Sequence, residues 1–128
     1  MNTDLPTPPP LLVACLCAQW CKLCDEYRTV FDAAAQAGSC PHARFVWIDI
    51  EDDEAVLGPV DVDDFPTLLI ASGDTPLFFG PLTPHPGTLA RLLQSAAADE
   101  LGPLTDTETR GLASRVADLA MARNGLGG

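Results

Sequence analysis

The stretch LLVACLCAQWCKLC, residues 11–24, decides the fold of this chain. It opens with an unbroken apolar run over residues 11–18, which is typical of a strand buried in the centre of a parallel sheet. The run is followed by Trp20 and then by two cysteines, Cys21 and Cys24, that are separated by two residues. We expect the strand to place this thiol pair in the first turn of a helix.

The sequence after Cys21 has helical periodicity. Apolar residues recur at the spacing of one helix face: Leu23, Tyr27, Val30, Phe31, Ala34 and Ala37. Acidic residues 25–26 suit the first turn, and Gly38 predicts the end of the helix. The positive end of the helix dipole and the side chain of Lys22 would both stabilise a thiolate at Cys21. Cys24 would share its face, so we predict Cys21 as the attacking thiol and Cys24 as the more buried resolving thiol.

The middle of the chain predicts further strands and helices in an α/β order. Strands are expected at 44–50, 67–71 and 77–79, and the last two form a hairpin through the turn at 72–75. A short acidic helix is expected at 52–57. Another helix starts near Pro84 and Pro86, and its apolar face carries Leu89, Leu92, Leu93, Ala96 and Ala97. This order predicts one layered α/β domain over residues 11–98.

The two ends of the sequence differ from this domain. Residues 1–10 form a proline-rich lead-in, and residues 99–128 form a C-terminal helical extension. Thr105 and Glu108 fit a capping box at the start of the last helix. Its apolar face carries Leu112, Val116, Leu119 and Ala120. We expect this face to pack back on the domain of a monomer, with a dimer or partner contact as the alternative.

The composition narrows the possible partners and compartment. The 128 residues carry a formal charge of −11, from 18 acidic and 7 basic side chains, so we expect neither nucleic acid nor an anionic membrane as a partner. Residues 45–90 contain no Lys or Arg but nine acids. These acids form either a solvated face or a rim that selects basic partners. Five cysteines and no visible targeting segment predict a cytoplasmic protein in which C-x-x-C is catalytic or metal-binding.

A second motif, Phe65-Pro66-Thr67, directly precedes the strand at 67–71. Together with Trp20-Cys21-Lys22-Leu23-Cys24, it resembles the thioredoxin family, in which W-C-x-x-C follows the central strand and a cis-proline precedes the next one. Residues 48–51, Ile-Asp-Ile-Glu, resemble the acidic-alternating third strand of that family. The resemblance covers roughly residues 11–98. It implies a three-layer fold in which helices flank a mixed sheet of about four strands, to which this chain adds a C-terminal helix.

The resemblance also implies a substrate-binding surface. It predicts that Pro66 is cis and packs against the thiols, and that the backbone of Phe65, beside Thr67, offers strand-like hydrogen bonds to a bound peptide. Trp20 would shield the thiols and contact the substrate. The alternatives are a trans proline that opens a strand and a tryptophan that belongs to the core.

The chain departs from the family at several positions. Lys22 and Leu23 replace the usual Gly-Pro pair between the cysteines, a dipeptide that tunes the redox potential. Cys15 stands where the family has a buried acid beneath the resolving thiol, and the family's first strand and helix are absent. Cys15 and Cys17 share a strand face, so both could lie under the helix as inert core residues, or one could be a third redox thiol. Asp64 lies beside the motif at Phe65, where its charge would raise a thiol pKa and disfavour anionic glutathione.

These features predict a thiol–disulfide oxidoreductase that serves cell redox homeostasis. We expect protein disulfides as substrates, an unidentified thiol as reductant, and no cofactor. The alternative is a binding or adaptor protein, similar to a co-chaperone, with little redox turnover. A metal site would need Cys40 and His42 beside the thiol pair, but their spacing places them beyond the far end of the helix, so none is expected.

Overall fold

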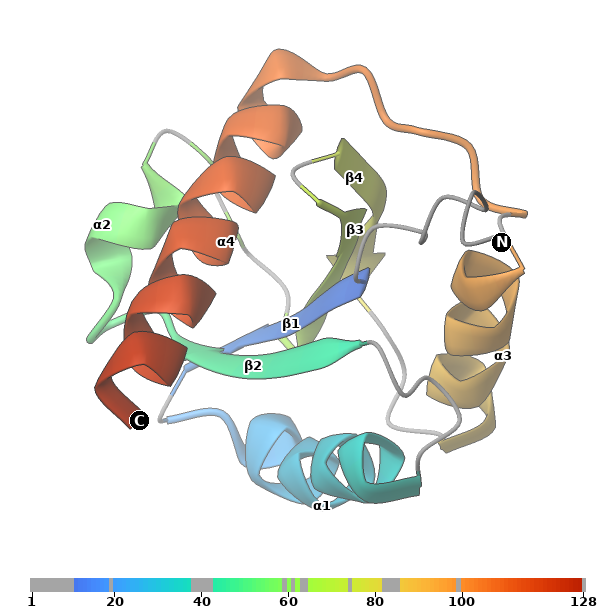
Figure 1. The fold of residues 1–128 in the computed structure, drawn as a ribbon. Helices are drawn as coiled ribbons and strands as arrows, with labels where there is room; N and C mark the ends of the chain where they lie inside the picture. The colour runs from blue at the N-terminus through green and yellow to red at the C-terminus, as the bar shows by residue number, and fades with distance from the viewer. Residues whose placement is uncertain are drawn as a thin grey trace.

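The order of the elements follows the sequence prediction. The computed structural model describes residues 11–18, 20–37, 43–58, 60, 62, 65–73, 75–81, 86–98 and 100–127. Their helices and strands are β1 (Leu11–Cys17), α1 (Lys22–Ala37), β2 (Arg44–Asp49), α2 (Glu54–Leu57), β3 (Thr67–Ser72), β4 (Thr75–Pro81), α3 (Pro86–Ala97) and α4 (Thr107–Gly127). Figure 1 shows how the helices surround the sheet.

The sheet is mixed and has the strand order β2-β1-β3-β4. β1 is parallel to β2 and antiparallel to β3. β3 and β4 form the predicted antiparallel hairpin, and Gly73 supplies the positive φ (62°) of its turn. β4 is longer than the predicted 77–79, because it pairs with β3 along the whole length of that strand.

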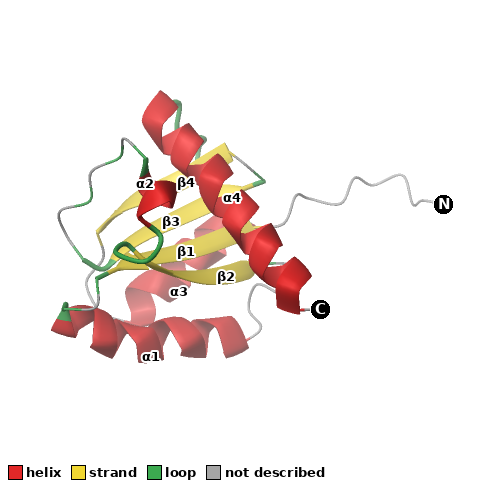
Figure 2. Ribbon diagram, turned by 90° about the vertical axis from the view of Figure 1, so that its left-hand side faces the viewer, coloured by secondary structure: helices red, strands yellow, loops and turns green. Residues whose placement is uncertain are grey.

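Helices cover both faces of the sheet, as Figures 1 and 2 show. Even-numbered residues of β1 (Leu12, Ala14 and Leu16) pack with α4, and odd-numbered ones (Val13, Cys15 and Cys17) pack with α1 and α3. All six of these side chains are buried, which agrees with the absence of polar alternation in this stretch. The prediction of a mixed four-stranded sheet flanked by helices, with one more helix at the C-terminal end, is confirmed.

The C-terminal helix packs back on the sheet, as predicted. Leu112, Ala113, Val116 and Ala120 of α4 are buried against β1, β2 and β3. Arg115 adds two hydrogen bonds to the end of α2, from Nε to the carbonyl oxygen of Val56 (2.6 Å) and from a terminal guanidinium nitrogen to that of Leu57 (2.9 Å). Gly58 has a φ of 55°, and a Cβ there would lie 3.0 Å from the same guanidinium.

The predicted capping box of Thr105 and Glu108 is wrong. The side chain that caps α4 is Asp106, whose carboxylate accepts hydrogen bonds from the backbone N–H (3.0 Å) and the hydroxyl (2.8 Å) of Thr109. The helix begins at Thr107, one residue later than a cap at Thr105 requires. Thr109 therefore occupies the third helical position, where an N-cap side chain finds its backbone partner.

β2 ends at Asp49, one residue before the predicted end of this strand at Ile50. Oδ1 of Asp49 accepts hydrogen bonds from the backbone N–H groups of Glu51 (2.8 Å) and Asp52 (3.4 Å). This local turn competes with the continuation of the strand. No helix within the described part of the chain is long and apolar enough to span a membrane.

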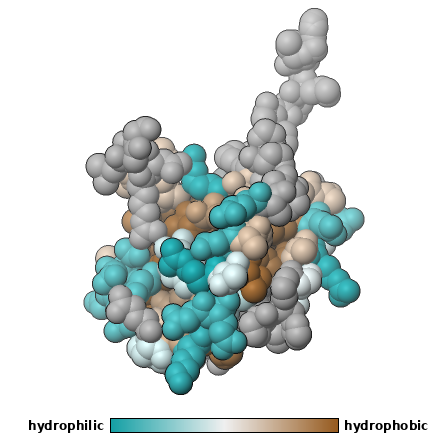
Figure 3. Space-filling model, turned by 90° about the horizontal axis from the view of Figure 1, so that it is seen from below, coloured by the Kyte–Doolittle hydropathy of each residue, from teal (hydrophilic) through white to brown (hydrophobic). Residues whose placement is uncertain are grey.

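Polar side chains cover the outer face of the layer that α1 and α3 form. Asp25, Glu26, Arg28 and Asp32 of α1 are all exposed. Figure 3 views the molecule from below Figure 1 and shows a largely hydrophilic surface there, with hydrophobic surface between the polar side chains.

Candidate functional site

The thiol pair lies where β1 turns into α1. The N–H of Cys21 donates to the carbonyl oxygen of Ala18 (3.1 Å), and the carbonyl oxygen of Cys21 accepts from the N–H groups of Cys24 (3.2 Å) and Asp25 (3.4 Å). Cys21 thus directly precedes the helix, and its side chain is half-buried. Cys24 is only 1% exposed. The pair therefore consists of one accessible thiol and one buried thiol.

The two residues between the cysteines, Lys22 and Leu23, are exposed. Leu23 was expected on the apolar face of the helix, but it is 47% exposed. The buried face instead contains Cys24, Tyr27 and Phe31, at the i, i+3, i+7 spacing of one helix side. A cysteine thus takes the core position that the sequence pattern gave to a leucine.

Two aromatic rings meet beside the thiol pair. The peptide bond between Phe65 and Pro66 is cis, and Pro66 is fully buried. Thr67 follows as a buried residue of β3, in register with Leu16 of β1. The ring of Phe65 meets that of Trp20 edge to face, with centroids 5.6 Å apart. Trp20 is 69% exposed, so the alternative that it belongs to the core is wrong.

Two more thiols lie beneath the pair. Cys15 and Cys17 are fully buried on the α1 side of the sheet, and their Sγ atoms are 3.6 Å apart. Cys17 and Cys24 belong to the same buried cluster. The hydrogen bond with Cys15, together with burial, raises the pKa of Cys17 well above its ordinary value. Burial, with a contribution from Cys17, raises the pKa of Cys24 in the same way. All four cysteines of this region are free thiols.

A buried hydroxyl lies against the same cysteines. Tyr27 of α1 is 0% exposed, and its hydroxyl has no hydrogen-bond partner among the residues that the structure describes. Burial raises the pKa of this phenol, with smaller contributions from Cys15 and Cys17. The hydroxyl therefore stays neutral and carries the cost of an unpaired polar group.

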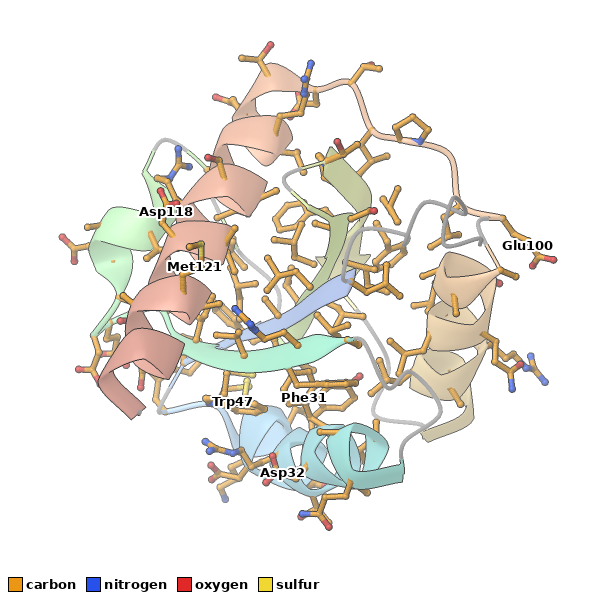
Figure 4. All side chains as sticks on the ribbon, viewed as in Figure 1. Phe31, Asp32, Trp47, Glu100, Asp118 and Met121 are labelled. Atoms are coloured by element: carbon orange, nitrogen blue, oxygen red, sulfur yellow. The ribbon has the colours of Figure 1, made fainter. Side chains whose placement is uncertain are left out.

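A cavity of about 570 Å³ opens between the start of α1 and the end of β2. Cys17, Cys24 and Trp47 line it together with the charged residues Asp25, Arg28, Asp49 and Asp52. Arg28 lies 4.6 Å above the ring of Trp47, and its Nε is 3.7 Å from a carboxylate oxygen of Asp32. Figure 4 shows Trp47 and Phe31 side by side between β2 and α1. Two buried thiols thus border a space with three carboxylates and one guanidinium.

Three residues that the sequence analysis considered for the site lie outside the described residues: Asp64, Cys40 and His42. Within the described ranges, no group of three or more His, Cys, Asp or Glu side chains could hold a metal ion.

The sequence did not predict the cavity or the buried hydroxyl of Tyr27. Trp47 reaches Cys15 only through the register of β2 against β1, which pairs these two residues, and no local pattern encodes that register. Tyr27 fits the apolar helix face as well as a phenylalanine would, so the sequence pattern did not indicate that its hydroxyl is buried without a partner among the described residues. The placement of Cys15 and Cys17 on one strand face, by contrast, was correctly predicted.

Known proteins resemble this chain through the fold and not through the sequence. No protein-family model matches it, and no curated protein does. Among solved structures, a thioredoxin from Trypanosoma brucei brucei superimposes with a TM-score of 0.61 at 23% identity, and the match covers 76% of this chain and 83% of that one. The germline-specific thioredoxin Deadhead of Drosophila melanogaster gives 0.60 at 21% identity, over 68% and 81% of the two chains.

A third solved structure gives the same result. The mitochondrial thioredoxin 3 of Saccharomyces cerevisiae matches with a TM-score of 0.59 at 21% identity, over 68% of this chain and 79% of that one. The chain therefore has a thioredoxin-like fold, as its motifs predicted. At these identities the likeness establishes the fold alone.

Proposed function

We propose that the chain is a thiol–disulfide oxidoreductase that acts on protein disulfides. The observation that carries this proposal is the pairing of half-buried Cys21, at the start of α1, with buried Cys24 three residues on. One thiol is accessible to a substrate and the other is protected beside it, which is the arrangement that two-step disulfide exchange needs.

The reaction would proceed in two exchanges. The thiolate of Cys21 attacks one sulfur of a substrate disulfide, so a mixed disulfide forms and the other substrate sulfur leaves as a thiolate. Cys24 then attacks Sγ of Cys21, which releases the second substrate thiol and leaves a Cys21–Cys24 disulfide. A small-molecule or protein thiol would regenerate the pair. No cofactor takes part in these steps.

The surface around Cys21 would hold the substrate. Trp20, which directly precedes the accessible thiol, contacts the ring of the half-buried Phe65. A substrate peptide would lie along the backbone at Phe65, which directly precedes Pro66 and β3. Lys22, exposed beside Cys21, favours negative charge at this end of the helix.

One observation favours the alternative of a binding protein with little turnover. Burial raises the pKa of Cys24 well above its ordinary value, and the buried Cys15 stands at the position where the family resemblance implies an acid that would accept the proton. A resolving thiol that loses its proton reluctantly slows the second exchange.

Reduction of insulin by dithiothreitol tests the proposal. We expect the protein to accelerate the reaction, Cys21→Ser to abolish the acceleration, and Cys24→Ser to trap a mixed disulfide with the substrate. Cys40→Ser is the matched control for thiol loss outside the pair. A wild-type rate equal to the dithiothreitol background would exclude the oxidoreductase and leave the binding protein.

A further inference from the structure

The proposed function uses two thiols, but four lie at this end of β1. Cys15 and Cys17 are 0% and 2% exposed and form one buried cluster with Cys24 and Tyr27. The sequence alone left two readings of these residues, inert core cysteines or a third redox thiol. The lining of the cavity, which includes Cys17 and Cys24 but not Cys15, distinguishes the two residues.

We propose that Cys17 is a third redox-active thiol that exchanges with the Cys21–Cys24 disulfide to form a Cys17–Cys24 disulfide and a free Cys21. This inference rests on the proposed function and deepens it, because it adds a residue to the same site. It makes Cys17 the residue that attacks the sulfur of Cys24.

The geometry of β1 excludes a disulfide between Cys15 and Cys17. Cys15 and Cys17 are two residues apart on one strand, so their Cα atoms lie about 6.6–6.8 Å apart, at the upper limit for a disulfide. Their Cβ atoms point the same way from the sheet, which keeps them too far apart for a bond. The 3.6 Å between their Sγ atoms is therefore a thiol–thiol contact within the strand.

Cys17, and not Cys15, lines the same cavity as the resolving thiol. Cys17 is the last residue of β1, next to the turn that leads into α1, and its carbonyl oxygen accepts from the N–H of Ile50 (2.9 Å). Cys24 belongs to the same buried cluster as Cys17, and the two residues line one cavity together with Ala18. Cys24 thus lies between the accessible thiol of its own helix turn and a cavity that it shares with a second buried thiol.

The exchange balances without an added oxidant. The thiolate of Cys17 attacks Sγ of Cys24, the bond between Cys21 and Cys24 breaks, and Cys21 leaves as a thiolate. The proton that Cys17 loses is matched by the one that Cys21 takes up from solvent. The protein carries one disulfide before and after the step.

The surroundings of Cys17 affect the rate of this exchange and the access of small oxidants to the thiols. The raised pKa of Cys17 keeps its thiolate scarce, so the exchange is slow and is best measured at equilibrium. The cavity beside β2 is lined by Cys17 and Cys24, so a small oxidant can reach this pair from a side other than that of Trp20. An oxidised protein would then keep Cys21 available as a nucleophile.

Disulfide mapping in the full-length chain tests the inference. The variant Cys21→Ala/Cys40→Ala retains Cys15, Cys17 and Cys24. It is oxidised with diamide, quenched in acid, unfolded, alkylated and digested with trypsin, which cuts after Lys22 and so separates Cys24 from the other two cysteines. We expect a cross-linked peptide that dithiothreitol removes. Adding Cys15→Ala should leave the cross-link, and adding Cys17→Ala should abolish it.

The opposite dependence on these two cysteines, or alkylation of all three thiols after diamide, would overturn the inference. Circular dichroism of each variant establishes that it is folded. The oxidised wild-type protein gives a second measurement without substitutions, once chymotrypsin is added to cut after Trp20 and so separate Cys17 from Cys21. The inference expects both Cys21–Cys24 and Cys17–Cys24 peptides, and Cys21–Cys24 alone contradicts it. Insulin reduction is measured separately. A Cys17–Cys24 disulfide without insulin reduction would exclude only the oxidoreductase function, and insulin reduction without this disulfide would exclude only the role of Cys17.

Discussion

The ring of Trp20 meets the ring of Phe65 edge to face, with a centroid distance of 5.6 Å and an interplanar angle of 88°. The two residues come from distant parts of the chain, one directly before the thiol pair and one shortly before β3. An exposed indole held in this way offers a rigid apolar surface next to Cys21.

Trp20→Ala should therefore weaken substrate binding. We expect the KM for insulin to rise roughly tenfold, which corresponds to about 1.4 kcal/mol, with little change in the melting temperature. Met121→Ala is the matched control, because Met121 is also a large exposed apolar residue (65%) but lies on α4. An equal rise in KM for both variants would argue against a docking role for Trp20.

The acidic cavity should select small disulfides by charge. Cystamine is dicationic and dithiodiglycolate is dianionic, so we expect cystamine to oxidise the reduced protein faster, and the difference to shrink in 1 M salt. Asp52→Asn removes one exposed carboxylate from the lining and should reduce the preference by a few-fold. Asp118→Asn makes the same charge change on α4. If it reduces the preference equally, net charge and not the cavity governs access.

The buried thiols make stability depend on alkaline pH. Burial raises the pKa of Cys24, and the contact with Cys15 together with burial raises that of Cys17, from an ordinary value of 9.0. Above this pH the unfolded chain loses protons that the folded chain retains, so the free energy of unfolding should fall as pH rises past about 9. The slope is up to about 1.4 kcal/mol per pH unit for each thiol. Urea titrations of the reduced protein measure it, and Cys17→Ala should make it shallower. An unchanged slope would mean that Cys17 ionises freely in the folded state.

Tyr27→Phe should stabilise the protein by about 1 kcal/mol. The substitution removes a buried hydroxyl that lacks a partner among the described residues and keeps the ring in the core. Tyr27→Leu, which also removes the ring, should destabilise it. Thermal unfolding in calorimetry compares the three proteins. A loss of stability in Tyr27→Phe would show that the hydroxyl is hydrogen-bonded.

Asp106→Ala should cost about 1 kcal/mol, the typical value of an N-cap side chain. The carboxylate holds the backbone N–H and the hydroxyl of Thr109 at the start of α4. Denaturant unfolding provides the measurement. Asp118→Ala, at an exposed position within the same helix, should stay within about 0.5 kcal/mol. Thr105→Ala should also be neutral, and a larger loss there than at Asp106 would restore the capping box.

Local sequence patterns predicted the parts of this fold that depend on local chemistry. The apolar run of β1, the helix after Cys21 and the turn at Gly73 each show in a few adjacent residues. Leu23 was misplaced because the buried face of α1 consists of Cys24, Tyr27 and Phe31, and this face leaves Leu23 exposed. The cap of α4 was missed by one residue, since Thr105 and Asp106 both have capping side chains. The cavity depends on the register of β2 against β1, so no window of sequence could reveal it.

The hydrogen bonds of Arg115 have a consequence for biosynthesis. The four-residue helix α2 has no side-chain cap of its own at its start, and at its end two carbonyl groups rely on a guanidinium from almost sixty residues further along the chain. A ribosome makes α2 long before it makes Arg115, so this acidic segment leaves the exit tunnel without the hydrogen bonds that Arg115 donates to it. The region that borders the thiol cavity can close into its final form only after translation has passed the middle of α4.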